Sequence, residues 1–317
     1  MNQISISNAL KVFAIVTYIS IFLSYVIGSD YFVNYHDYIE MHAWYSSISD
    51  EDYSKLGDYA VGYGFIGYFF KNYLQADIYY FFLCISLFSV LIQLHSIFKN
   101  NQPLLYVIVV ATILSAYDLA YFRLGLCIAI VLTSFNMRNL YLRLALIILA
   151  SSIHIVGIIF LVPVIFSKYY SSNVINYAYL IAFSVLGFIK PLYISFLPFK
   201  YQFYFIDNSY IDPLLLIRLL IFSLIIIINT NYYPKSNFYK NISILFYCLT
   251  IILIDVNYAA NRVLDIAYLM LLPWICSYSG KNKKWIVFLM FTFIFFDILR
   301  YTIGDTLQNL VIYLYRT

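Results

Sequence analysis

Four basic side chains stand inside or at the edge of long apolar stretches: Arg123, His154, Arg218 and Arg262. A charged side chain in a transmembrane helix costs about 2.5–3.5 kcal/mol on insertion scales, so such a residue is expected to have a partner or a function. The guanidinium of arginine stays charged and its planar fork binds two oxygens at once, which suits phosphate. Three arginines that meet on the outer side of a membrane would therefore form a site for an anionic ligand.

Each arginine also has a structural alternative. Arg262 could pair with Asp265 three residues later, and Arg123 could pair with Asp118. Arg218 could extend to the outer lipid headgroups, because long basic side chains bury their stems and keep the charged end in water. For any single arginine, the sequence leaves the structural and the functional interpretation equally open.

His154 is expected near the middle of the bilayer, about 16 Å along its helix from Arg143 at a rise of 1.5 Å per residue. Ser151, His154 and Gly157 follow one another at i, i+3 and i+6. This spacing predicts one small, polar helix face that packs against the helix carrying Arg123. A hydrogen-bonded core histidine is the alternative interpretation.

The elements that must position these groups are membrane helices. Of the 317 residues, 63% are hydrophobic and 11% are charged, whereas a soluble domain has about 25% charged residues. Runs of about 20 apolar residues recur along the chain, which predicts an all-α polytopic membrane helical bundle with about 11 transmembrane helices, in the range 10–12. Residues 1–317 are expected to form a single integral membrane domain. The predicted spans are 8–28, 76–98, 103–120, 121–137, 142–166, 174–190, 191–206, 213–231, 240–256, 262–279 and 285–303.

Basic and acidic residues separate into alternate connections between these spans, as the positive-inside rule requires. The bases assigned to the cytoplasmic side are Lys99, Arg138, Arg143, Lys190, Lys235, Lys240, Lys281, Lys283 and Lys284. The acids assigned to the opposite side are Asp30, Asp37, Glu40, Asp50, Glu51, Asp52, Asp58, Asp77, Asp118, Asp207, Asp212 and Asp255. This separation places the N-terminus in the cytoplasm and the arginines near the extracytoplasmic surface.

The one long hydrophilic segment, residues 29–75, then becomes an extracytoplasmic loop after the first helix. It is rich in Tyr, Phe and Trp, so we expect it to lie at the membrane interface, where aromatic residues gather, or to form a wall that stacks on sugars. Asp30 and Asp37 follow the first span closely, and a carboxylate there could act as a general base on a sugar hydroxyl; a solvated acidic loop is the alternative. The stretch HDYIEMH (36–42) matches no metal-binding signature.

Several other classes of function are disfavoured. The net charge of +4 is small, and no basic stretch is interleaved with aromatic residues, which argues against nucleic-acid binding. The cysteines all fall within apolar runs and are interpreted as core residues: Cys84, Cys127, Cys248 and Cys276. The sequence contains no P-loop, no G-x-S-x-G and no H-E-x-x-H motif.

Four short motifs follow one another along the chain: GSDYFVNY (28–35), YFRLGLCIAI (121–130), SSIHIVGIIFL (151–161) and NRVLDIAYLMLLP (261–273). Together they resemble the EpsG-type and Wzy-type polysaccharide polymerases, with their G-x-D-Y element, Arg-led helix, F-H-[ST]-[AS] helix and late arginine–proline helix. The chain departs from that pattern where Leu124 replaces a glutamine and Ile153 replaces an aromatic residue. Its segment YAVGYGF (59–65) also lacks the family's glutamate.

The resemblance implies a polymerase that transfers a growing glycan from undecaprenyl diphosphate to the non-reducing end of a new lipid-linked repeat unit. Such an enzyme works at the periplasmic face of the bacterial inner membrane. Arginines would stabilise the diphosphate leaving group, and a carboxylate or imidazole would deprotonate or orient the acceptor hydroxyl. The implied diphosphate-binding residues are Arg123, Arg218 and Arg262. The implied catalytic residues are Arg123, His154, Asp30 and Asp37, and the implied sugar-binding residues are Tyr35 and Tyr258.

The resemblance also implies partners and alternatives. The expected partners are the undecaprenyl-diphosphate-linked oligosaccharide, membrane lipids, and a flippase and chain-length regulator of the same pathway; no nucleotide sugar, metal ion or other cofactor is expected. An O-antigen ligase shares this chemistry, and a membrane O-acyltransferase is a further enzymatic alternative. A flippase or transporter is the non-enzymatic one, although transporters favour internal repeats and paired broken helices, and only 191–206 reads as a broken helix here.

Overall fold

Helices make up all the regular structure in the described part of the chain, and no strand occurs there, so the prediction of an all-α fold is confirmed for these residues. The computed structural model describes residues 13, 15–17, 43–48, 60–97, 110, 111, 114, 122–167, 182, 185, 213–228, 237–254, 257–277, 284–290 and 292. Two of the described helices, Ile78–Ile97 and Ala259–Cys276, are long and apolar enough to cross a bilayer. The chain divides into two compact units, Met1–Ile165 and Phe166–Thr317.

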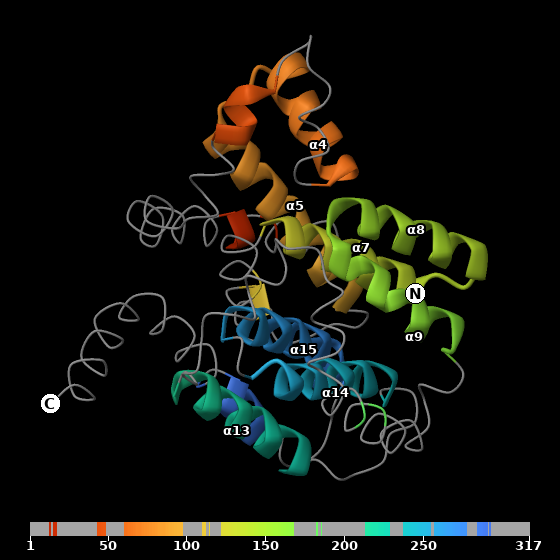
Figure 1. Ribbon diagram of the computed structural model, residues 1–317, viewed down its shortest axis with the longest axis vertical. Helices are drawn as coiled ribbons and strands as arrows, with labels where there is room; N and C mark the ends of the chain where they lie inside the picture. The colour runs from red at the N-terminus through yellow and green to blue at the C-terminus, as the bar shows by residue number, and fades with distance from the viewer. Residues whose placement is uncertain are drawn as a thin grey trace, which may run out of the picture. The chain divides into compact units, whose positions relative to one another are not determined.

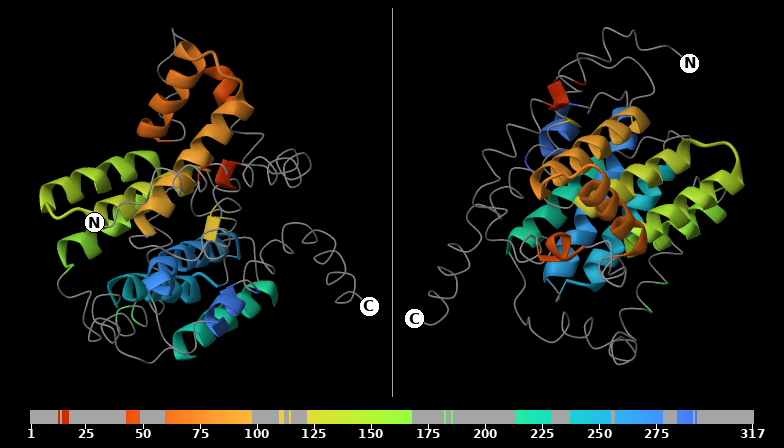
Figure 2. Two further views of the ribbon diagram at one scale, coloured as in Figure 1. Left: turned by 180° about the vertical axis from the view of Figure 1, so that it is seen from behind. Right: turned by 90° about the horizontal axis from the view of Figure 1, so that it is seen from above.

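The described residues of the first unit form a series of helices. They are α4 (Val61–Tyr68), the π-helical turn η2 (Phe69–Tyr73), α5 (Ile78–Ile97), α7 (Phe122–Asn136), α8 (Leu140–Ile153), the 3-10 helix η3 (Ile155–Phe160) and α9 (Leu161–Ile165). α5 packs along α7, and α7 packs along α8, so α7 lies beside both of the other helices (Figures 1 and 2).

Polar side chains set where these helices begin and how they pair. The Asn139 side chain accepts hydrogen bonds from the amides of Tyr141 and Leu142 at 2.9 and 3.4 Å, which caps the start of α8. Between α5 and α7, Gln93 Nε2 donates to the carbonyl of Gly125 at 3.0 Å. In a membrane such cross-helix hydrogen bonds add to van der Waals packing in holding helices together.

The described part of the segment 29–75, residues 43–48 and 60–75, packs within the first unit. Trp44, Tyr45 and Tyr63 are 4%, 5% and 0% exposed, and Trp44 stacks on Tyr63 with ring centroids 5.7 Å apart. The interpretation of this segment as an interfacial anchor or a sugar-stacking wall is therefore wrong for these three residues, because their rings pack against protein. Lys71 Nζ donates to the carbonyls of Ser46 and Ile48 and ties the segment together.

The second unit contains α13 (Pro213–Ile228), α14 (Asn237–Ile252) and α15 (Asn257–Ser277). α14 lies along α15 (Figures 1 and 2), and Ser243 Oγ donates to the carbonyl of Ala267 across their interface. α13 starts at Pro213, where the missing proline N–H costs nothing because the first amides of a helix have no partner within it. α15 continues through Pro273, near its C-terminal end.

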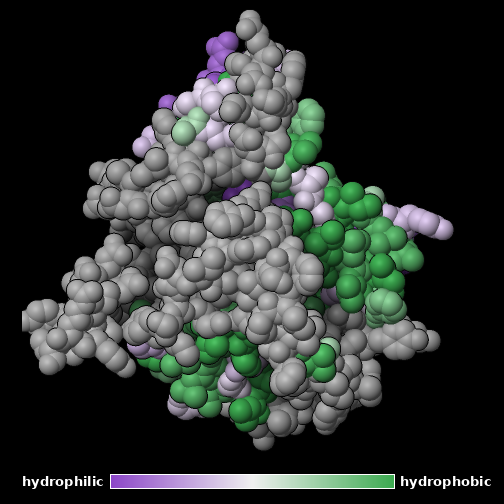
Figure 3. Space-filling model, viewed as in Figure 1, coloured by the Kyte–Doolittle hydropathy of each residue, from purple (hydrophilic) through white to green (hydrophobic). Residues whose placement is uncertain are grey.

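Large apolar side chains are exposed on both units, as expected of surfaces that face lipid. Figure 3 shows hydrophobic atoms over the coloured surface around α8 and α9, and again around α13. The exposed residues on the first of these surfaces include Ile148, Leu149, Ile155, Ile158, Val162 and Ile165. Those on α13 include Leu216, Ile217, Leu220, Leu224 and Ile227.

Several predicted spans agree with the helices observed. The spans 76–98, 121–137 and 213–231 correspond to α5, α7 and α13 within a few residues, and 240–256 corresponds to α14. The span 262–279 starts too late, because α15 already begins at Asn257. The spans 103–120, 174–190 and 191–206 and most of 8–28 and 285–303 lie outside the described residues.

The prediction of one continuous helix over 142–166 is wrong. α8 ends at Ile153, His154 is extended with φ −149° and ψ 131°, and the chain resumes as η3 and then α9. Hydropathy cannot reveal such a break, because the residues on both sides are apolar. The predicted polar face of Ser151, His154 and Gly157 therefore does not exist as a helix face, although α7 does pack against both α8 and η3.

Candidate functional site

Arg123 lies in the first turn of α7, close to Tyr63 of α4. Its guanidinium carbon stands 6.0 Å from the ring centroid of Tyr63 in α4, which is cation–π distance. Tyr63 is itself fixed, because it is buried between Trp44 and Phe81, with ring centroids 5.7 and 5.6 Å away. A partly exposed arginine thus lies beside a buried, closely packed tyrosine ring.

α4 reaches this position because it approaches the end of α8 closely. A Cβ built on Gly62 would lie 2.3 Å from Ser152 Oγ, so only glycine allows this contact without a shift. The next residue, Tyr63, is thereby brought over Arg123. Small residues at helix contacts let backbones come close together in membrane proteins. The stretch VGYGFIGY of α4 supplies such residues.

His154 stands at the break between α8 and η3, and both its backbone and its ring hold the break in place. Its amide donates to the carbonyl of Ala150 at 2.9 Å, and its carbonyl accepts from the amide of Gly157 at 2.8 Å. The ring Nδ1 accepts a hydrogen bond from the amide of Val156 at 3.3 Å, which caps the start of η3. The imidazole is partly exposed.

The break lies close to Arg123 along α7. Cys127 Sγ is 3.9 Å from the carbonyl oxygen of His154, and Cys127 follows Arg123 by four residues, or about 6 Å of helix rise. The structure therefore brings Arg123, Tyr63 and His154 to one junction of α4, α7 and α8. We call these three residues, together with Ser152, the unit 1 junction.

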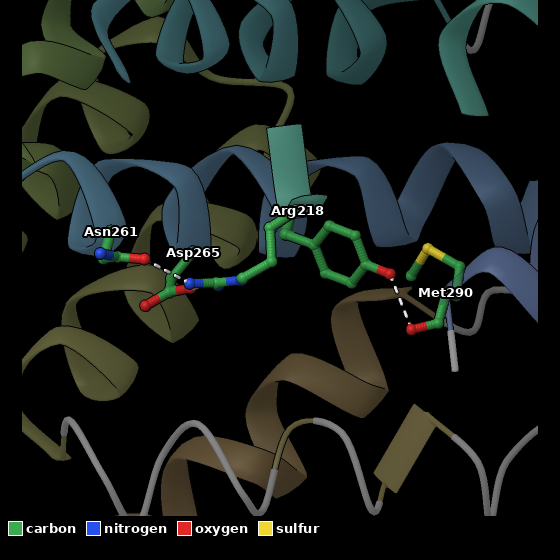
Figure 4. A network of polar contacts seen from close by, with 5 residues as sticks. Arg218, Asn261, Asp265 and Met290 are labelled. Carbon is green, nitrogen blue, oxygen red and sulfur yellow. Dashed lines mark hydrogen bonds and ion pairs between the residues drawn. The ribbon is translucent and has the colours of Figure 1, made fainter. Parts of the chain in front are cut away.

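The second unit places Arg218 in a different setting. Its guanidinium donates through Nη1 to Asn261 Oδ1 at 2.7 Å and forms an ion pair through Nη2 with Asp265 (Figure 4). Arg218 and Asp265 are both 0% exposed. Asn261 and Asp265 are four residues apart on α15, so they present one face to α13. We call Arg218, Asn261 and Asp265 the buried triad.

The buried triad corrects one structural alternative considered from the sequence. Arg218 does not extend its charge toward the headgroups, because its side chain is enclosed and its guanidinium is bonded to α15. Asp265 was weighed as a partner for Arg262, yet it forms an ion pair with Arg218. Arg262 follows Asn261 directly, about 100° further round the helix, and is partly exposed.

The remaining site residues stay predictions. Arg123 belongs to one unit and Arg218 and Arg262 to the other, and their convergence on a single ligand stays a prediction from the sequence. Asp30, Tyr35 and Asp37 lie outside the described residues, as do Asp118 and the HDYIEMH stretch. Tyr258 lies in α15, where the backbone alone is described. Within the described ranges, no three His, Cys, Asp or Glu side chains gather as a metal site would need.

Sequence reasoning missed Tyr63 and the partners of Arg218. For Asn261 and Asp265 a signal was present, because a spacing of four on a helix predicts a shared face. For Tyr63 no such signal existed, since it is one of 35 tyrosines in the chain and its partner is 60 residues away. Only the packing of α4 on α8 selects it.

Comparison with known protein families identifies a match to this chain. The sequence profile of the EpsG family matches residues 12–317, which is nearly the whole chain. No curated protein matches the chain, and no solved structure matches it.

Proposed function

This chain belongs to the EpsG family of membrane proteins of polysaccharide biosynthesis, and from that premise we propose that it is a polymerase acting on lipid-linked glycans. It takes a growing glycan from undecaprenyl diphosphate and adds it to the non-reducing end of the next lipid-linked repeat unit. The reaction occurs at the periplasmic face of a bacterial inner membrane. The partly exposed Arg123 at the unit 1 junction is the observation that carries this proposal.

The proposed transfer exchanges one bond at the anomeric carbon for another. The acceptor hydroxyl attacks the anomeric carbon of the donor glycan, a glycosidic bond forms, and the bond from that carbon to the diphosphate oxygen breaks. The acceptor proton passes to a base, and undecaprenyl diphosphate leaves with one more negative charge. Groups that stabilise developing charge on the leaving oxygen therefore accelerate the reaction most.

Arg123 suits that role because of how it is held. The contact with Tyr63 is made to the π face of the tyrosine ring and is not a hydrogen bond to the guanidinium N–H groups. Those N–H groups lie in the plane of the fork and can meet two phosphate oxygens at once. The charge pattern of the sequence predicts that the start of α7 lies near the outer surface, at the depth of the lipid diphosphate.

For the other two arginines we propose a division of tasks. Arg262 contacts the diphosphate, because it is partly exposed at the start of α15. Arg218 was predicted as a third ligand, but the ion pair with Asp265 engages its charge. We therefore assign Arg218 to fixing α15, and with it Arg262, against α13.

The acceptor side of the reaction rests on residues predicted from the sequence. Asp30 or Asp37 is the proposed general base, since each follows the first span on the periplasmic side. Tyr35 and Tyr258 are the proposed sugar contacts. The lipid tail remains between helices, and a flippase and a chain-length regulator are the proposed protein partners.

The test is to delete the gene and examine the surface polysaccharide on gels, followed by an assay of the purified full-length protein with a lipid-linked repeat unit. Loss of polymerisation leaves single repeat units in the deletion strain, and the purified protein lengthens the lipid-linked unit. Full-length polymer that accumulates on the lipid carrier would instead indicate a ligase and contradict the proposal.

A further inference from the structure

The ring of His154 caps the helix that follows the break between α8 and η3. α8 ends, the backbone becomes extended for one residue, and η3 begins with its amide at Val156 bonded to His154 Nδ1. Asparagine, aspartate and serine commonly cap helices in this way through a side-chain oxygen. Here an imidazole nitrogen performs the same task.

The cap decides where the proton of the imidazole lies. A backbone N–H can only donate, so Nδ1 is the acceptor and carries no proton. A neutral imidazole has one protonated and one unprotonated nitrogen, so its proton is on Nε2. In this tautomer, Nε2–H is a hydrogen-bond donor. It has no lone pair with which to take a proton from a sugar hydroxyl.

Close packing of the backbone around His154 keeps the break, and with it the ring, at the end of α8. A Cβ on Gly157 would lie 2.6 Å from the amide nitrogen of Ser151, so the chain can fold back onto the end of α8 only with glycine there. The ring is partly exposed at the unit 1 junction. Arg123 lies about one helical turn away along α7, as the contact of Cys127 with the His154 carbonyl indicates.

We infer that His154 acts as a neutral hydrogen-bond donor through Nε2–H to an oxygen of the lipid-linked substrate, and that it is not the general base. This inference rests on the proposed function, and of the two roles considered from the sequence, deprotonating or orienting the acceptor hydroxyl, it excludes the first. His154 and Arg123 then approach the same anionic group, the diphosphate of the donor. The acceptor proton goes elsewhere, to a carboxylate such as Asp30 or Asp37.

Three substitutions separate a donor from a base. Asparagine in His154→Asn caps η3 with its oxygen and donates with its amide, but it cannot take up a proton. Aspartate in His154→Asp caps but cannot donate when ionised, and alanine in His154→Ala does neither. Purified His154→Asn is expected to keep polymerisation within about tenfold of wild type, whereas the other two lose about 10²-fold or more. An asparagine variant as inactive as the alanine variant, with unchanged melting temperature, would overturn the inference.

A second measurement is independent of activity. The chain has four histidines, so nitrogen-15 NMR of histidine-labelled full-length protein in nanodiscs gives few ring signals, and comparison with His154→Asn assigns the signal of His154. We expect the Nε2–H tautomer; the Nδ1–H tautomer would contradict the inference. If this spectrum is as expected but wild-type protein fails to lengthen a lipid-linked unit, the proposed function fails and the state of His154 stands.

Discussion

Arg123 and Arg218 are the same residue type in two opposite settings. In the buried triad, Arg218 is enclosed, and its N–H groups are bonded to a carboxylate and an amide of α15. In the unit 1 junction, Arg123 is partly exposed, and its guanidinium carbon lies at cation–π distance from the ring of Tyr63. Pairing with a carboxylate neutralises a charge and joins two helices, whereas a cation–π contact positions a charge without itself neutralising it. The comparison separates an arginine that supports the fold from one suited to an anion.

The largest expected effect is on the stability of the buried triad. Arg218→Ala leaves Asp265 ionised and buried without its ion-pair partner, so it should destabilise the protein by about 3–5 kcal/mol. The thermal unfolding of purified protein in detergent measures this change. Replacing both partners, in Arg218→Met with Asp265→Leu, should recover most of the loss, because apolar residues of similar volume often substitute for a buried ion pair. No recovery in the double variant would argue that the pair does more than join α13 to α15.

The next effect concerns activity rather than stability. Arg123→Lys keeps the charge but loses the planar fork and its stacking, so polymerisation should fall about 10²-fold, which corresponds to about 2.7 kcal/mol. Melting temperature should remain near that of wild type. Arg138→Lys is the matched control, since Arg138 is exposed in the connection between α7 and α8 and should tolerate the change. Normal polymer lengths in Arg123→Lys would contradict the claim that Arg123 binds an anionic substrate.

A smaller effect tests how Tyr63 is brought over Arg123. Gly62→Ala places a Cβ against Ser152 Oγ, so α4 must move away from α8, at a cost of about 1–3 kcal/mol. Adding Ser152→Ala removes the nearest clashing atom and should restore part of the stability and part of the activity. Additive losses in the double-mutant cycle would show that the two residues are not in contact.

The smallest effect is a pH dependence at Tyr45, in the segment 29–75. Tyr45 donates to the carbonyl of Ala76 at 2.8 Å, and burial, with a contribution from the Asp77 charge, raises the pKa of Tyr45 to about 12 from 10.0. A raised pKa favours the protonated folded form, so this contribution is complete below pH 10 and is lost as the pH rises through 12. Tyr45→Phe should cost about 1 kcal/mol at pH 8 and less at pH 11. A difference in melting temperature that does not shrink at pH 11 would contradict this account of Tyr45.

The sequence predicted the helices better than it predicted their contacts. The spans of α5, α7 and α13 follow from runs of apolar residues, because burial in lipid requires nothing more specific than an apolar surface. The break at His154 was missed because Ile155–Phe160 is as apolar as a helix would be, and a cap depends on one hydrogen bond. The ion pair of Arg218 with Asp265 joins residues 47 positions apart, and only the packing of α13 on α15 chooses it.

The candidate site was predicted in part. Arg123 and His154 stood out because polar groups in apolar runs are costly, and the structure brings both to the unit 1 junction. Their neighbours were not predictable, since Tyr63 and Ser152 are common residue types without a distinguishing spacing. Among the aromatic residues of the segment 29–75, the interfacial or sugar-stacking interpretation is wrong for Trp44, Tyr45 and Tyr63, whereas Phe65, Phe69 and Tyr73 are exposed. Composition reveals that a segment is aromatic, but it does not reveal whether the rings face lipid, sugar or one another.

The central claim is that Arg123 binds the diphosphate of the lipid carrier. Its most direct test is a titration of undecaprenyl diphosphate against purified full-length protein in nanodiscs, with wild type, Arg123→Lys and Arg138→Lys compared. The account predicts that Arg123→Lys weakens binding at least about tenfold, or about 1.4 kcal/mol, while Arg138→Lys binds as wild type does. Equal affinity in all three proteins would contradict it.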